Sequence, residues 1–225
     1  MTLPEAILRA LTLVSLACLA PVGAEAATLR GSLAVPAAAP RAATRNAYPG
    51  HADAMASHGM APRGAVNDAV LWLERIPAAA DSAIAATPRP RPRLAQKDQC
   101  FMPRVVSVAA GGAVEFPNQD PIYHNVFSVS TTKRFDLGKY PKGHSRSVTF
   151  PRAGLVNVYC DIHSDMAAFV IVTPNHAFAQ PATDGSWELP DVPAGHYTLH
   201  VWHPDFGAFE RDVEIAGDRP LALAF

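Results

Sequence analysis

The sequence has few cysteines and little excess charge of either sign. Its 225 residues include three Cys, and the 19 Lys and Arg nearly balance the 20 Asp and Glu. No basic patch indicates nucleic-acid binding, and no apolar run reaches the roughly 20 residues of a membrane span. Helix signals are scarce too, because beyond the N-terminus no window of about 12 residues shows a capped 3.6-residue period. These absences favour an all-β protein.

The N-terminus has the features of an export signal. Arg9 precedes an apolar run over 10–20, and Ala24-Glu25-Ala26 fits a small-residue cleavage site. We therefore expect residues 1–26 to be a secretory signal peptide. Its removal takes away Cys18 and leaves Cys100 and Cys160, which an exported protein ordinarily joins in a disulfide.

The remainder consists of short alternating segments broken by Pro and Gly, which is typical of a β-sandwich. Residues 36–64 predict a long loop, and 77–93 predict a stiff, extended linker with no helix. An edge strand is expected at 28–35 and a buried strand within 66–76. Further strands are expected at 93–96, 104–109, 113–117, 124–128, 145–150, 154–160, 168–173, 187–189, 196–203, 209–215 and 221–225.

One short segment combines three potential metal ligands. Cys160, His163 and Met166 follow one another at Cys-x2-His-x2-Met spacing, and His124 lies upstream at the start of an expected strand. One Cys, two His and a weak axial Met form the ligand set of a blue-copper electron-transfer site. Zinc is less suitable, because Met is a poor zinc ligand. The pattern predicts one copper ion bound by a free Cys160 thiolate, which speaks against a bridge to Cys100.

Two segments resemble the cupredoxin family. The run 116–127 is similar to the segment that carries the first ligand, and 159–166 is similar to the ligand loop, with the short spacing of amicyanin. Residues 135–140 further resemble exported bacterial plastocyanin-like proteins of the methylamine-utilisation type. The resemblance implies that 93–173 form a Greek-key β-sandwich with one type 1 copper, which exchanges electrons with periplasmic protein donors and acceptors.

The same resemblance assigns roles to individual residues. It implies that His124, Cys160, His163 and Met166 are the ligands, and that Asn125 braces the ligand loop through hydrogen bonds. Asp161 stands where many cupredoxins have Ser or Thr, and a carboxylate there would weaken this brace and lower the reduction potential.

The flanking segments resemble a different module. Residues 183–199 and 66–73 are similar to the carboxypeptidase-regulatory, transthyretin-like β-sandwich. This implies that 27–92 and 174–225 form a second small sandwich, with 93–173 inserted between its halves. The simpler alternative is one copper domain with a C-terminal β appendage.

The predicted function is that of an exported electron carrier without substrate turnover. The sequence contains no His-x-His pair of the multicopper oxidase kind and no serine-hydrolase or zinc-protease motif. Two alternatives stay open. A copper-delivery protein would use the tract of His51, Met55, His58 and Met60, whose other interpretation is a spacer. A non-metal adhesion or carbohydrate-binding sandwich would have Cys100 and Cys160 bridged.

For the electron carrier, the apolar residues around Met166, such as 167 and 168, are expected to form a docking patch for redox partners.

Overall fold

The structure is a computed structural model that describes residues 26–37, 64–217 and 220–225. Nearly all of its regular structure is β, which confirms the predicted fold class. The predicted signal peptide, apart from Ala26, and the tract of His51, Met55, His58 and Met60 lie outside the described residues. Neither helix in the described part is long and apolar enough to cross a bilayer.

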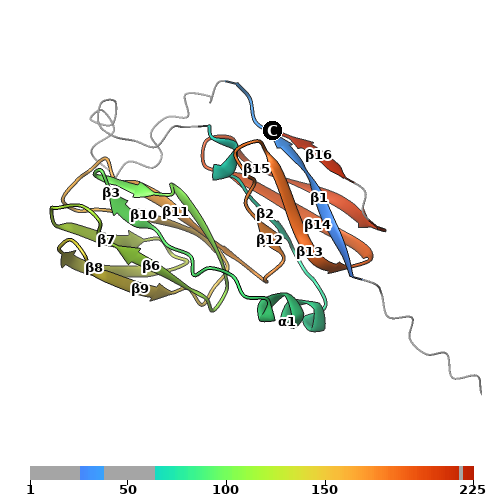
Figure 1. The fold of residues 1–225 in the computed structure, drawn as a ribbon, viewed down its shortest axis with the longest axis horizontal. Helices are drawn as coiled ribbons and strands as arrows, with labels where there is room; N and C mark the ends of the chain where they lie inside the picture. The colour runs from blue at the N-terminus through green and yellow to red at the C-terminus, as the bar shows by residue number, and fades with distance from the viewer. Residues whose placement is uncertain (1–25, 38–63, 218–219) are drawn as a thin grey trace, which may run out of the picture.

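The middle of the chain forms a body that we call the first sandwich, on the left in Figure 1. Its main sheet has the order β5-β11-β10-β7-β8, and two-stranded sheets β6-β9 and β3-β4 accompany it. The strands are β3 (Ala95–Lys97), β4 (Cys100–Met102), β5 (Val105–Ala109), β6 (Ala113–Pro117), β7 (His124–Val129), β8 (Arg134–Tyr140), β9 (Ser145–Thr149), β10 (Gly154–Tyr159) and β11 (Ala167–Thr173).

The core of the first sandwich follows from strand alternation. In β10, Val156 and Val158 point inward and are fully buried, and aromatic residues such as Phe116 meet them from another sheet. Cys160 and Met166 belong to the same buried cluster. The motif of the ligand loop is therefore anchored in the apolar core.

Strands from both ends of the chain form the second sandwich, on the right in Figure 1. One sheet has the order β13-β1-β16 and the other β12-β2-β14-β15, and both contribute to one buried cluster. Their strands are β1 (Ala26–Ala34), β2 (Val70–Leu73), β12 (Phe178–Ala179), β13 (Ser186–Pro193), β14 (Gly195–His203), β15 (Gly207–Ile215) and β16 (Leu221–Ala224). Each sheet thus combines chain from before and after the first sandwich.

The strands β4, β8 and β12 were not predicted, and two predicted segments have a different structure from the one expected. The predicted edge strand is β1, which is central because it pairs antiparallel with β13 and parallel with β16. The predicted extended linker contains the helix α1 (Ala78–Ala86). Six of its nine residues are alanine, the strongest helix former, and only Ile84 is buried. Such a helix shows no hydrophobic period, which explains why the pattern missed it.

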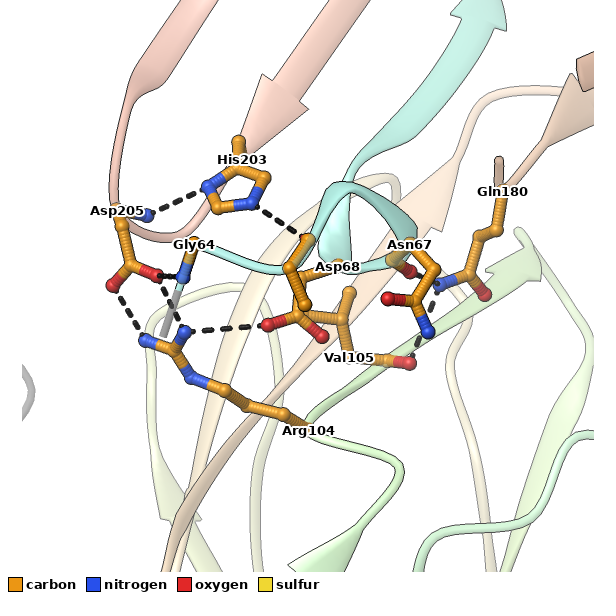
Figure 2. Close-up of polar contacts among 9 residues, drawn as sticks. Gly64, Asn67, Asp68, Arg104, Val105, Gln180, His203 and Asp205 are labelled. Carbon is orange, nitrogen blue, oxygen red and sulfur yellow. Dashed lines mark hydrogen bonds and ion pairs between the residues drawn. The ribbon is translucent and has the colours of Figure 1, made fainter. Parts of the chain in front are cut away.

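A buried ion cluster joins the two sandwiches (Figure 2). Arg104, between β4 and β5, donates two hydrogen bonds to Asp205 at 2.6 and 2.7 Å. The same guanidinium lies 3.3 Å from Asp68, which ends the short 3-10 helix η1 (Val66–Asp68). All three side chains are at most 9% exposed. An apolar cluster of Val70, Val105, Phe169 and Ile171 lies at the same junction.

His203 is buried at the edge of this ion cluster. Its Nε2 donates to the carbonyl of Ala65 at 3.0 Å, and its Nδ1 accepts from the backbone N–H of Asp205 at 3.0 Å (Figure 2). Asp68, His203 and Asp205 lie close enough for their donor atoms to share a cation. Arg104 already supplies the positive charge, and both nitrogens of His203 are occupied, so this group has the chemistry of a structural ion cluster.

Candidate metal centre

Strand pairing brings the four predicted ligands to one end of the first sandwich. His124 is the first residue of β7, and Cys160 directly follows β10. Because β7 and β10 are antiparallel neighbours, with Phe127 opposite Tyr159, the start of one strand lies beside the end of the other. His163 and Met166 lie on the loop from β10 to β11. Residues distant in sequence are thus gathered by the sheet itself.

The nitrogen and sulfur atoms of three predicted ligands converge. The Nδ1 atoms of His124 and His163 are 3.1 Å apart, and the sulfur of Cys160 is 3.9 Å from Nδ1 of His163. All three donor atoms lie within 4.8 Å of one another. His124 is fully buried and Cys160 nearly so, whereas His163 is half-buried. The imidazole of His163 therefore lies near solvent, whereas His124 and Cys160 lie inside the protein.

The orientation of His124 is fixed from its far side. Its Nε2 lies 2.7 Å from Oδ2 of Asp120, a carboxylate oxygen that only accepts hydrogen bonds. Nε2 must therefore carry the proton, which in the neutral ring leaves Nδ1 with a free lone pair. That lone pair faces His163 and Cys160. The tautomer is the one that a metal-binding Nδ1 requires.

Asp120 is itself held by the turn of the β3-β4 hairpin. The backbone N–H groups of Asp98 and Gln99 donate to its two oxygens at 2.7 and 2.9 Å. Burial alone would raise the pKa of Asp120, but these bonds and the bond to His124 hold it below its usual value. The sequence analysis gave Asp120 no role. A carboxylate four residues before a strand-initial His is the signal that could have indicated it.

The ligand loop is short and closed by its own backbone. The N–H of Met166 donates to the carbonyl of His163 at 3.1 Å, and the N–H of Cys160 donates to the carbonyl of Met166 at 3.3 Å. Met166 is 1% exposed. Burial, followed by the proximity of His124, lowers the pKa of His163 below its usual value, which favours the neutral form that a metal needs.

Three further expectations about single residues have different outcomes. Cys160 is not in a disulfide with Cys100, which is half-buried. Asn125 donates to Asp136 at 2.7 Å, and this bond does not support the expected brace to the ligand loop. Asp161 is exposed. The lowering of the reduction potential that we expect from Asp161 therefore stays a prediction.

The expected docking patch does not form at residue 168. Ala168 is 1% exposed, because it faces the core from β11. Large exposed apolar side chains lie elsewhere near the ligands, namely Ile122 and Tyr123 just before His124, and Ile162 just before His163. The apolar surface beside the site therefore comes from these loop residues.

The donor set suits copper. A cysteine sulfur and two imidazole nitrogens converge, and a buried methionine closes the same loop, which is a soft set that favours copper over magnesium or calcium. The lone pair on Nδ1 of His124 faces Nδ1 of His163 at 3.1 Å. A cation between the three donors would satisfy all of them.

The similarities to known proteins cover part of the chain. No protein-family profile and no curated protein matches the chain. Among solved structures, it is similar to a copper-containing nitrite reductase from Thermus scotoductus, with 23% identity, a TM-score of 0.36, and coverage of 39% of this chain and 23% of that one. Amicyanin from Paracoccus versutus is 24% identical with a TM-score of 0.35, over 40% of this chain and 87% of its own.

An amicyanin mutant in the Cu(I) form is similar at 21% identity, with a TM-score of 0.35, over 40% of this chain and 88% of that one. The chain spans less than a quarter of the nitrite reductase and most of the amicyanins. These likenesses concern part of the fold. The chemistry of the site depends on its own geometry.

Proposed function

We propose that the chain is a type 1 copper protein that carries single electrons between protein partners, with no substrate turnover of its own. His124, Cys160, His163 and Met166 would hold one copper ion. When bound, copper supplies a one-electron couple. The protein positions the donors, favours the neutral form of His163 and excludes water from the inner side of the site.

One observation carries the proposal. His124, at the start of β7, and His163, on the loop after β10, place their Nδ1 atoms 3.1 Å apart, beside a buried cysteine sulfur that is not bridged. Two lone pairs facing each other at this distance repel unless a proton or a cation lies between them. A thiolate next to them makes the cation the favourable choice.

The same geometry favours electron transfer over metal delivery. A delivery site must let the ion leave, and this needs ligands that move into solvent. Here His124 is fully buried, and Cys160 and Met166 are part of the core cluster. A close-packed environment resists rearrangement of the ligands between oxidation states. Electron exchange then takes place through His163, the most exposed of the ligands.

The proposal extends to location and partners. Because the N-terminal residues have the pattern of a signal peptide, we place the protein in the periplasm. Ile122, Tyr123 and Ile162 are exposed and adjoin ligand residues in the sequence, and they offer an apolar contact of the small size typical of transient redox encounters. We also assign the second sandwich to the transthyretin-like type that the flanking sequence resembles, with 93–173 inserted into it.

The test is the visible absorption of the copper-loaded mature chain. We expect an intense band at the red end of the spectrum, which arises from a short bond between Cu(II) and a thiolate. His163→Ala should abolish this band, because it removes one of two imidazole donors, while far-UV circular dichroism stays unchanged. His163 is half-buried at a loop, so its truncation removes little of the core.

His144→Ala is the matched control. His144 is an exposed histidine between β8 and β9 of the same sandwich, and the loss of its side chain should leave the band intact. A band that survives His163→Ala unchanged would contradict the ligand assignment. A colourless Cu(I) protein that resists oxidation would favour delivery, and a Cys100–Cys160 bridge found by mass spectrometry would favour the non-metal alternative.

A further inference from the structure

Asp120, the carboxylate that contacts Nε2 of His124, is buried and held by several hydrogen bonds. Asp120 is 5% exposed and accepts three hydrogen bonds no longer than 2.9 Å, from Asp98, Gln99 and His124. We propose that Asp120 is a positioning residue for the metal centre, which fixes the tautomer of His124 and increases the electron donation of this ligand. The inference rests on the proposed copper function and assigns a determinant of its reduction potential.

The backbone around Asp120 is fixed before any metal arrives. Its N–H donates to Oδ1 of Asn118 at 2.9 Å, and Nδ2 of Asn118 donates to the carbonyls of Ile122 and Tyr140 at 2.8 and 2.9 Å. Asn118 is 1% exposed, so these bonds are shielded from water. The loop between β6 and β7 is thereby held rigid, and Asp120 and His124 keep their relative positions.

The second support comes from the β3-β4 hairpin. Its turn residues Asp98 and Gln99 both have left-handed backbone conformations, with φ of 54° and 56°. Successive residues in this conformation point their N–H groups to one side, where Asp120 accepts both. The N–H of Gln119 also donates to the carbonyl of Gln96 at 2.9 Å. The hairpin therefore acts as an anion cradle for a carboxylate whose remaining bond goes to His124.

This arrangement has a consequence for the metal. A carboxylate that accepts a hydrogen bond from Nε2–H makes the imidazole a stronger electron donor than a neutral acceptor does. Stronger donation stabilises Cu(II) more than Cu(I), because the higher charge gains more from it. Asp120 therefore raises the affinity for Cu(II) and lowers the reduction potential. It does so without contacting the ion.

The experiment compares Asp120→Ala and Asp120→Asn in the full mature chain. The first removes the acceptor, and the second keeps an oxygen for Nε2 but removes the charge. In the metal-free protein, long-range 1H–15N NMR should show His124 protonated only at Nε2 in the wild type and in Asp120→Asn, and as a tautomer mixture in Asp120→Ala. Titration with Cu(II) should show an affinity roughly 10- to 100-fold lower for Asp120→Ala. Protein-film voltammetry should show a higher reduction potential for Asp120→Asn.

Glu115→Gln is the matched control, because it removes one negative charge from a partly exposed carboxylate of the same sandwich that pairs with Arg91 and Arg93. A similar shift of the reduction potential in Glu115→Gln and Asp120→Asn would show that only the loss of charge matters, and it would overturn the proposal. So would an unchanged tautomer and Cu(II) affinity in Asp120→Ala. If Asp120→Ala does not fold, the reduction potential of Asp120→Asn tests the proposal, and an unchanged potential would overturn it. A wild type that binds no copper refutes the proposed function, while the metal-free NMR comparison still tests Asp120.

Discussion

At the scale of single residues, Met166 combines two roles that can be separated. It is 1% exposed and packs in the core cluster of the first sandwich, and it closes the ligand loop through its backbone. A buried methionine is by itself ordinary core. Its position three residues beyond His163 and one before β11 is what makes it a ligand candidate.

Substitution by a residue of equal volume distinguishes these roles. Met166→Leu should change the free energy of unfolding of the metal-free protein by less than about 1.5 kcal/mol, whereas Met166→Ala should cost about 2–5 kcal/mol. In the copper-loaded protein, Met166→Leu should raise the reduction potential, because the loss of a thioether donor disfavours Cu(II). Denaturant unfolding and voltammetry measure the two effects. An unchanged potential would assign Met166 to the core alone.

The four candidate ligands could be selected from the sequence because their residue types and spacing are chemically restrictive. Cys160, His163 and Met166 lie on one loop, so their proximity follows from local sequence. The role of Asp120 could not be predicted. It depends on backbone N–H groups from another hairpin, and nothing in the types of Asp98 or Gln99 reports where their amides point.

At the scale of elements, prediction succeeded where alternation was strong. The strand expected at 113–117 is β6, and the one expected at 196–203 is β14 within one residue. β8 was missed as a strand, because one of its faces is exposed and Gly138 interrupts the pattern with φ of 63°. The pairing of β1 on both sides was missed too, since sheet position depends on partners far away in sequence.

At the scale of the whole molecule, the buried cluster of Arg104, Asp68 and Asp205 couples the two sandwiches. One guanidinium faces two carboxylates, so one negative charge is left in excess. Burial raises the pKa of Asp68 to about 6, even though Arg104 opposes this. For Asp205, burial acts in the same direction but is outweighed by the bonds from Arg104, and its pKa lies below the usual value.

The raised pKa of Asp68 predicts a pH dependence of stability. The folded protein binds this proton more tightly than the unfolded chain, so the contribution of Asp68 to stability falls as pH rises from its ordinary pKa of 3.8 to about 6. Asp68→Asn should therefore differ little from wild type near pH 4. Near pH 8 it should be more stable, by at most about 3 kcal/mol at 1.36 kcal/mol per pKa unit.

Chemical denaturation at both pH values measures this difference, with Asp161→Asn as the exposed control. An Asp68→Asn variant less stable than wild type near pH 8 would show that the charge of Asp68 is needed at the junction.

Asp205→Asn should behave in the opposite way and lose stability near pH 8. It breaks a pair of hydrogen bonds to Arg104 and leaves the charge of Arg104 partly uncompensated.

The central claim is that copper is bound by one sulfur of Cys160 and two histidine nitrogens. X-ray absorption at the copper edge of the loaded wild-type protein measures this directly. The account predicts one sulfur at short distance and two nitrogens as the nearest neighbours of the metal, with the sulfur lost in Cys160→Ser. A nearest shell made only of nitrogen and oxygen in the wild type would contradict it.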